Sequence, residues 1–208
     1  TLFAKVASGD PITMLTCYDY PTAFFQEQAG IDMILVGDSL GMTMLGYETT
    51  LPVTMDDMLS HTAAVSRATN RVLVIADMPF MSYATRDQAL GNAVRLMQDG
   101  GAKMVKLEGG ARVLPQVEAL VAAGIPVMAH LGLTPQSVNQ LGGYRVQGRG
   151  EDGEIPMQDA KAMEAAGAFA IVLEVVPSDL AERVTRSLSI PTIGIGAGQM
   201  SRVDADRK

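Results

Sequence analysis

The sequence has one cysteine, Cys17, and no tryptophan. A single cysteine excludes an internal disulfide and a thiolate metal cluster, so a reducing, cytoplasmic setting fits best. The sequence also lacks an apolar run of the roughly 18 residues that a membrane helix needs, and no signal-peptide pattern opens it. Basic residues are outnumbered 16 to 23, which gives a formal net charge of −7. Because nucleic-acid-binding proteins present a basic face, we expect neither nucleic acid nor membrane as a partner.

Hydrophobic residues, in contrast to cysteine and tryptophan, are abundant. The chain has 208 residues, 48% of them hydrophobic, which is enough for one sizeable core. No low-complexity segment interrupts it, and residues 1–208 are predicted to form one domain.

Short apolar segments rich in β-branched residues alternate with helical patterns along the whole chain. Their almost uninterrupted apolar character is typical of strands buried on both faces, as in a parallel sheet. The predicted strands are residues 12–18, 32–37, 72–77, 104–108, 126–130, 168–175 and 191–196. The predicted helices are residues 21–29, a segment from Thr54, a segment from Thr85 to the Gly100–Gly101 pair, and residues 113–123, 157–166 and 178–188.

Seven strand–helix units in a row favour a (β/α) barrel, because an open doubly wound sheet usually stops at five or six strands. Residues 133–156 form the longest stretch without a regular pattern. That length exceeds an ordinary connection, so we interpret the stretch as a functional loop.

Ionisable residues stand at the C-terminal ends of the predicted strands, where the catalytic groups of a (β/α) barrel lie. Strand after strand is apolar until its last residue or two. The polar residues at these ends are Asp38, Ser39, Asp77, Lys106, Glu108, His130 and Glu174. Since side chains alternate along a strand, Lys106 and Glu108 share one face, and both point into the site if that face looks into the barrel.

Each of these residues also has a purely structural interpretation. Asp38 or Asp77 could cap the helix that follows, Lys106 could pair with Glu108, and His130 could be a hydrogen-bonded core residue. Taken together, these interpretations do not explain why every case falls at the same end of its strand. His61, in contrast, is interpreted as a hydrogen-bonded residue on a helix face.

The converging carboxylates indicate a cation. At about 5 Å and an effective dielectric constant near 20, two carboxylates repel each other by roughly 3 kcal/mol. The four acids of this row are Asp38, Asp77, Glu108 and Glu174. An all-oxygen ligand set suits Mg²⁺ or another hard divalent cation.

A hard metal ion, a lysine and a spare carboxylate favour enolate chemistry on an α-keto acid. The metal and Lys106 would hold the substrate and stabilise negative charge on its enolised oxygen. The carboxylate would remove a proton next to the carbonyl. Acyl transfer by Ser39 is less favoured, because no histidine lies near it in the sequence.

Several motifs resemble the ketopantoate hydroxymethyltransferase family, in order, from about residue 11 to residue 198. They are "LVGDSLGMT", "LPVT", "HTAAV", "ADMPFMSY", "MVKLEGG", "HLGLTPQSVNQLGGYRVQGR", "LEVVP" and "IPTIGIGAG". The resemblance implies transfer of a hydroxymethyl group from methylenetetrahydrofolate to α-ketoisovalerate (3-methyl-2-oxobutanoate), which gives ketopantoate for pantothenate and coenzyme A synthesis. It also implies a (β/α)₈ barrel and a homo-oligomer, typically a decamer.

The same resemblance assigns roles to individual residues. Asp38 in "GDS" and Asp77 in "AD" resemble metal ligands that also contact the substrate, and Glu108 in "KLEG" would lie beside the metal, directly or through water. Lys106 and Ser39 would contact the keto acid.

Three further features of the site follow from the resemblance. His130 in "HLG" would line the site, and Glu174 in "LEVVP" resembles the general base that takes the C3 proton. The "GGYRVQGR" segment is expected over the mouth of the barrel.

The sequence departs from the family after "GIGAG". Residues 199–208, "QMSRVDADRK", are polar, so we expect the eighth strand and the helices after it to be missing from this sequence. Either the chain is truncated or an internal stretch is absent; we favour the second, because a seven-stranded barrel would leave two edges unpaired.

Two other functions remain open. One is a Mg²⁺-dependent C–C lyase or mutase of the isocitrate lyase/phosphoenolpyruvate mutase kind. Such enzymes typically carry a "KxCG"-type cysteine, whereas Cys17 lies in the first predicted strand. The other is an inactive barrel that persists as a subunit of an assembly, against which the intact Asp38, Asp77 and Glu174 argue.

Overall fold

A computed structural model describes residues 5, 8, 10, 12–149, 153–198 and 203–204 of the chain. Its strands are parallel, and each pairs with the next along the sequence. They are β1 (Ile12–Thr16), β2 (Met33–Val36), β3 (Leu73–Asp77), β4 (Met104–Glu108), β5 (Val127–Gly132), β6 (Ala170–Glu174), β7 (Thr192–Ile195) and β8 (Val203–Asp204). All seven predicted strands are confirmed, with boundaries that shift by a few residues.

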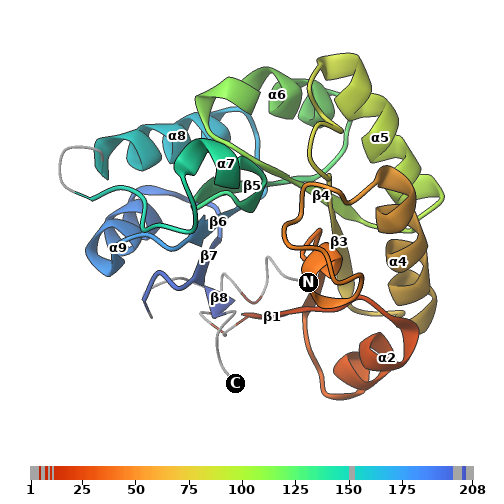
Figure 1. The fold of residues 1–208 in the computed structure, drawn as a ribbon. Helices are drawn as coiled ribbons and strands as arrows, with labels where there is room; N and C mark the ends of the chain where they lie inside the picture. The colour runs from red at the N-terminus through yellow and green to blue at the C-terminus, as the bar shows by residue number, and fades with distance from the viewer. Residues whose placement is uncertain are drawn as a thin grey trace.

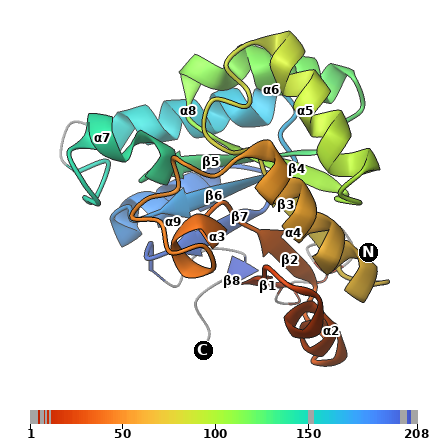
Figure 2. The same cartoon turned by 45° about the vertical axis from the view of Figure 1, so that its right-hand side comes forward.

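Helices form an arc around the outside of the curled sheet (Figure 1). The longer ones are α2 (Tyr20–Gln28), α4 (Met55–Ala68), α5 (Arg86–Gln98), α6 (Leu114–Ala122), α8 (Glu154–Ala165) and α9 (Ser178–Ser187). The short helices α3 (Leu40–Thr43) and α7 (Val138–Leu141), and the 3₁₀ turns η1 (Ala111–Val113) and η2 (Pro135–Ser137), lie in the segments that follow β2, β4 and β5. They therefore stand at the C-terminal end of the sheet, as the turned view also shows for α3 and α7 (Figure 2).

The region predicted as a long functional loop contains two of these short elements, η2 and α7. Pro135 is placed at the start of η2, where its fixed φ suits a helical turn and no N–H is needed. The chain thus turns sharply at the end of β5 and stays close to the ends of the strands.

The closure of the sheet corrects our expectation for the tail. We expected no strand in residues 199–208, but Val203–Asp204 pair in parallel with both β1 and β7, so the strands close into a ring. Backbone N–H and C=O groups are the same in a polar segment, which is why a polar sequence can still pair with open edges. This pairing is only two residues long, and a full eighth strand is not shown.

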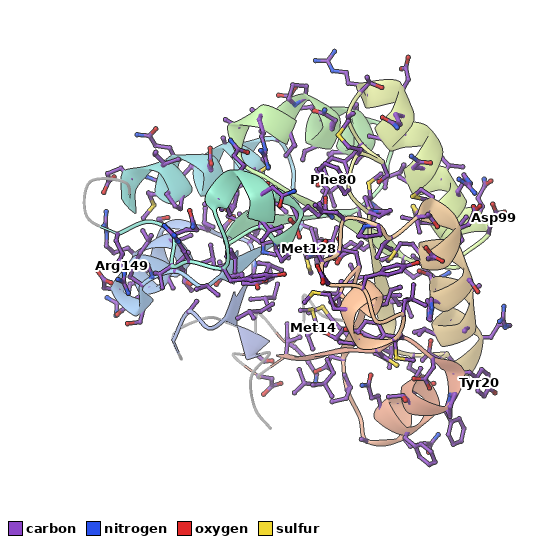
Figure 3. All side chains as sticks on the ribbon, viewed as in Figure 1. Met14, Tyr20, Phe80, Asp99, Met128 and Arg149 are labelled. Carbon is purple, nitrogen blue, oxygen red and sulfur yellow. The ribbon has the colours of Figure 1, made fainter. Side chains whose placement is uncertain are left out.

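The core is divided in two by the strands. Residues of one parity fill the inside of the ring: Ile12, Met14, Met33, Leu35, Ile75, Met104, Met128, Ala170, Val172 and Ile193. Met14 and Met128 can be seen there, while Tyr20 and Asp99 lie on the outside (Figure 3). Residues of the other parity, such as Val105 and Leu107, pack against the helices. This interior layer is an apolar floor beneath the C-terminal strand ends.

Helix α4 begins at the capping box that Thr54 forms with Asp57, since the Thr54 side chain accepts from the Asp57 backbone and the Asp57 carboxylate accepts from the Thr54 backbone. Thr85 caps α5 in the same manner by accepting from the Gln88 backbone. Across the described part of the chain, no helix has the length and apolar character required to cross a membrane.

The buried carboxylate of Glu27 ties α2 to the segment that enters β3. It accepts backbone N–H groups of Asn70, at 2.9 and 3.0 Å, and of Arg71, at 2.6 Å. Burial by itself raises the pKa of Glu27, but these hydrogen bonds outweigh it and hold the pKa below its usual value.

Replacing Glu27 by Gln is expected to lower the free energy of unfolding by about 1–3 kcal/mol at pH 7, because the amide has one acceptor oxygen in place of the two with which the carboxylate accepts the Asn70 and Arg71 N–H groups. A carboxyl group with a depressed folded-state pKa stabilises the fold above its unfolded pKa and loses this effect as the pH falls. The gap between wild type and Glu27→Gln should therefore shrink below about pH 4. Urea denaturation at several pH values measures it, with the exposed Glu118→Gln as control; a gap that is constant with pH would contradict the account.

Candidate active site

The C-terminal ends of the strands bring the predicted polar residues together, and alternate residues of a strand share a face as expected. Register places Asp77 beside Lys106 and Glu108 beside His130 on neighbouring strands. All four side chains share the parity of the interior layer, and each residue is only 2–3% exposed. Glu174 ends β6, and its side chain is 19% exposed. The prediction that Lys106 and Glu108 face into the barrel is consistent with this placement.

The buried lysine pairs with a different acid from the one we considered. Lys106 Nζ lies 2.5 Å from Asp77 Oδ1 in an ion pair whose side chains are both 4% exposed. The other oxygen of Asp77 accepts the backbone N–H of Asp38 at 3.1 Å. Asp77 therefore joins the ends of β2 and β4, and its side chain bonds to these neighbours in place of capping a following helix.

Gln136 is a member of the site that the sequence did not reveal. This buried residue of η2 donates its side-chain amide to Asp38 Oδ2 at 2.8 Å and its backbone N–H to Glu108 Oε2 at 3.0 Å. Its amide oxygen accepts from the hydroxyl of Tyr83 at 2.5 Å. No sequence signal separates this glutamine from the others in the segment, because its role depends on the turn after β5.

His130 lies between two carboxylates. Its Nδ1 is 3.7 Å from Glu108 Oε1, and its Nε2 is 3.3 Å from Glu174 Oε2. Neither contact has hydrogen-bond geometry, and neither ring nitrogen finds another partner among the residues that the structure describes. Within the described residues, His130 is therefore flanked by two carboxylates and makes no hydrogen bond to either, unlike the hydrogen-bonded core histidine considered as an alternative.

Ser39 lies at the mouth of the site, at the start of α3. Its hydroxyl is 2.8 Å from that of Tyr18, a residue that the sequence analysis did not single out. His61, on α4, has its Nδ1 2.6 Å from the carbonyl oxygen of Tyr18, which confirms that it is hydrogen-bonded on a helix face. Together these bonds fix the segment between β1 and α2 against the serine.

Charge burial governs the ionisation of the site. Burial, followed by the nearby Asp77 and Glu108, raises the pKa of Asp38 to about 8. Burial also raises the pKa of Glu108, against the opposing effect of His130 and Lys106. Burial alone would lower the pKa of Lys106, but the carboxylates around it prevail and hold the pKa above its usual range. The lysine is thus a permanent cation, and the acids around it outnumber it.

The donor chemistry fits a hard cation with few protein ligands. Within the described ranges, no three Asp, Glu, His or Cys side chains are placed together so as to hold a metal ion. Lys106 and the Asp38 backbone N–H instead bond to the two oxygens of Asp77, and Gln136 bonds to one oxygen of Asp38. Mg²⁺ is usually held by one or two carboxylates, with water and substrate completing its shell. The residues present suit that arrangement better than a closed three-ligand cage.

The chain just after Glu174 is strained. Val175 has a φ of 47°, a left-handed conformation that β-branched residues rarely adopt. Its N–H donates to the carbonyl of Ile195 at 2.8 Å, and its carbonyl accepts from the N–H of Gln147 at 3.0 Å. These two bonds offset the strain and fix the direction in which the chain leaves Glu174.

The "GGYRVQGR" segment reaches across to the β2 side of the barrel. The Tyr144 hydroxyl lies 3.7 Å from the sulfur of Met42 in α3, while Gln147 bonds to the end of β6 as above. A cavity of about 490 Å³ opens nearby, with Phe80, Arg112, Glu108 and Gln136 in its lining. Phe80 marks its position in Figure 3. Glu108 and Gln136 belong to the candidate site and also line this cavity, so the cavity reaches the site from the β4 side.

Comparison with known sequences gives one consistent result. The sequence model of the ketopantoate hydroxymethyltransferase family matches residues 1–205. The chain is 62% identical over 199 residues to 3-methyl-2-oxobutanoate hydroxymethyltransferase of Moorella thermoacetica, covering 95% of this chain and 74% of that protein. It is 60% identical over 199 residues to the enzyme of the same name from Thermobifida fusca, covering 95% and 71%.

Comparison with solved structures identifies the fold. Phosphonopyruvate hydrolase in complex with oxalate and Mg²⁺ superposes with a TM-score of 0.72 at 17% identity, over 93% of this chain and 70% of that one. A 2,3-dimethylmalate lyase of the PEP mutase/isocitrate lyase superfamily gives 0.67 at 19% identity, over 93% and 70%. At these identities the likeness shows a shared α/β fold with a curled parallel sheet.

The raised pKa of Asp38 predicts how the stability of the metal-free protein depends on pH. A group whose folded-state pKa is raised stabilises the fold below its unfolded pKa, about 3.9, and this effect is lost as the pH rises through the folded value. That value is about 8. Asp38→Asn cannot ionise, so at pH 8 in a chelator it should be more stable than wild type by at least about 1 kcal/mol.

Denaturation at pH 4, 6 and 8 tests this expectation, with the exposed Asp99→Asn as control. The advantage of Asp38→Asn should vanish at pH 4. If the free energy of unfolding depended on pH in the same way for wild type and Asp38→Asn, the pKa of Asp38 would not be raised in the folded protein.

Proposed function

The chain belongs to the ketopantoate hydroxymethyltransferase family, and we propose how the residues of its site carry out the reaction of that family. The enzyme transfers a hydroxymethyl group to 3-methyl-2-oxobutanoate, the reaction named for its relatives. We propose methylenetetrahydrofolate as the donor and ketopantoate as the product, which places the reaction in pantothenate and coenzyme A synthesis. The observation that carries this function is the convergence of Lys106, His130 and Glu174 above the apolar floor of the barrel.

A divalent cation, Mg²⁺ or a similar hard ion, is proposed at Asp38 and Asp77, with Glu108 as a direct ligand or one that acts through water. When bound, the cation would supply positive charge to the carbonyl and carboxylate oxygens of the keto acid. The excess of buried acid over base around Lys106 supports this proposal. So does phosphonopyruvate hydrolase, a protein of the same fold that was solved with oxalate, a small dicarboxylate, and Mg²⁺.

Lys106 and Ser39 are proposed to orient the keto acid, with Asp38 and Asp77 beside them. The buried ammonium of Lys106 is held by Asp77 at 2.5 Å, so its position is fixed before substrate arrives. It can stabilise negative charge that develops on the substrate oxygen when the C3 proton leaves. The Ser39 hydroxyl, held by Tyr18, offers a donor at the rim of the site.

Glu174 is proposed as the general base that removes the C3 proton. Glu174 has the most exposed side chain among the acids of the site, and it lies at the end of β6 beside His130. His130 lines the site and can donate a hydrogen bond to Glu174 or to substrate. The two backbone hydrogen bonds of Val175, which has a left-handed conformation, fix the backbone next to Glu174.

The wider setting is also proposed from family membership. We propose a one-domain (β/α)₈ barrel, a cytoplasmic location and a homo-oligomer, a decamer by resemblance, with no nucleic acid or membrane partner. The outer face of α2 exposes Tyr20, Phe24 and Phe25 by 43–69%, which supports an apolar contact with another subunit.

A C–C lyase or mutase function has weaker support. The solved structures of that superfamily share the fold at 16–19% identity, whereas the hydroxymethyltransferases are 57–62% identical in sequence. Cys17 is buried just after β1, away from the position that a catalytic cysteine after a lysine would need.

Replacing Glu174 by Gln is expected to reduce kcat for ketopantoate formation by about 10²- to 10⁴-fold, because the amide cannot accept the C3 proton. The KM for the keto acid should change little, since the shape and polarity of the side chain are kept. Steady-state kinetics with both substrates measures this, and Glu118→Gln on the outer face of α6 should match wild type. A Glu174→Gln enzyme with normal kcat would remove Glu174 from the role of base.

Replacing Asp77 by Asn is expected to weaken Mg²⁺ binding by about tenfold or more, because a neutral amide is a poor ligand for a hard cation. The amide oxygen can still accept from Lys106, but the NH₂ group cannot accept the Asp38 N–H, so thermal unfolding of the metal-free variant is measured alongside to check that it folds. Isothermal calorimetry measures the affinity, with Asp99→Asn as the surface control. Unchanged Mg²⁺ affinity in Asp77→Asn would refute the assignment of Asp77 as a ligand.

A further inference from the structure

Gln136 connects the ends of three strands through its side chain and its backbone N–H. Its Nε2 donates to Asp38 Oδ2, after β2, at 2.8 Å, and to the carbonyl oxygen of Met78, after β3, at 2.9 Å. Its backbone N–H donates to Glu108 Oε2, at the end of β4, at 3.0 Å. The residue is 5% exposed, so these bonds form out of contact with bulk water.

The amide of Gln136 is held in one orientation. Its oxygen accepts the hydroxyl hydrogen of Tyr83 at 2.5 Å, so its NH₂ group must face Asp38 and Met78. Tyr83 is itself fixed, because the side-chain amide of Gln116 donates to the carbonyls of Tyr83 and Ala84 at 3.1 and 3.2 Å. The hydroxyl of Tyr83 is also 3.3 Å from the backbone N–H of Glu108, from which it accepts.

A neutral donor with two hydrogens is well matched to this position. A lysine or arginine would neutralise Asp38 and compete with a metal ion, and a carboxylate would add another acid to a site already rich in them. The amide satisfies one oxygen of Asp38 and, through its backbone, one oxygen of Glu108. The second oxygen of each carboxylate, Oδ1 of Asp38 and Oε1 of Glu108, takes no part in these bonds. Glu108 Oε1 lies 3.7 Å from His130 Nδ1 without a hydrogen bond to it.

We propose that Gln136 is a positioning residue for the metal site: together with Tyr83, it orients Asp38 and Glu108 so that each presents one fixed oxygen to the divalent cation. This inference rests on the proposed metal-dependent function. It assigns a role to the "TPQSVNQ" segment, which follows β5 and contributes no ligand of its own. Partners that orient metal ligands commonly change metal affinity by about 10- to 100-fold when they are removed.

The test is the binding of Mn²⁺ to the full chain, followed by electron paramagnetic resonance of the free ion, without any substrate. Gln136→Met keeps the volume of the side chain and removes its donors, and it should weaken Mn²⁺ binding by about 10- to 100-fold. Tyr83→Phe removes only the hydroxyl that orients the amide, and it should weaken binding by a smaller factor. Gln140→Met, the same change at an exposed glutamine of α7, should bind as wild type does.

The outcomes separate the possible roles. Thermal unfolding of the metal-free variants shows whether they fold, and Tyr83→Phe carries the test if Gln136→Met does not. Folded Gln136→Met and Tyr83→Phe proteins that bind Mn²⁺ as tightly as wild type would overturn the inference, even if they melt earlier, because the role would then be structural. In that case, weak binding by Asp77→Asn would leave the proposed metal site intact. Absence of Mn²⁺ binding by wild type would overturn the metal site and this inference together.

Discussion

The burial of negative charge above an apolar floor is the constraint on which the rest of the site depends. Methionines and branched residues fill the inside of the ring, and directly above them lie four carboxylates with Lys106 as the buried cation. The ion pair of Lys106 with Asp77 neutralises one acid and leaves the others in excess. An arrangement of this kind favours a bound divalent cation, which offsets the excess of negative charge and can in turn attract an anionic substrate.

Neighbouring groups keep this costly arrangement in place. Backbone N–H groups of Asp38 and Gln136 donate to Asp77 and Glu108, and the Gln136 amide donates to Asp38. Each of these donors comes from a segment that follows a strand, so the parallel topology itself brings them to the same end of the barrel. The strained backbone after Glu174 belongs to the same pattern, in which stability elsewhere in the fold supports a site built for chemistry.

Much of the fold and the row of strand-end residues could be predicted from the sequence. The strands were clear because they are short, apolar and β-branched, and period-two alternation indicated that Lys106 and Glu108 share a face. The roles of Gln136 and Tyr83 could not be predicted, because they depend on how the turn after β5 folds back over β2 and β4. The pairing of Val203–Asp204 was missed for a related reason, since the open edges of β1 and β7 determine it and the side chains of the segment do not indicate it.

The central claim is that this site enolises a keto acid with the help of a metal ion and a carboxylate base. The most direct measurement is the exchange of the C3 proton of 3-methyl-2-oxobutanoate in deuterated water, followed by proton NMR with wild-type protein and no folate. The account predicts exchange that requires Mg²⁺ and stops when a chelator is added. Exchange no faster than in buffer, or exchange that is equally fast in the chelator, would contradict it.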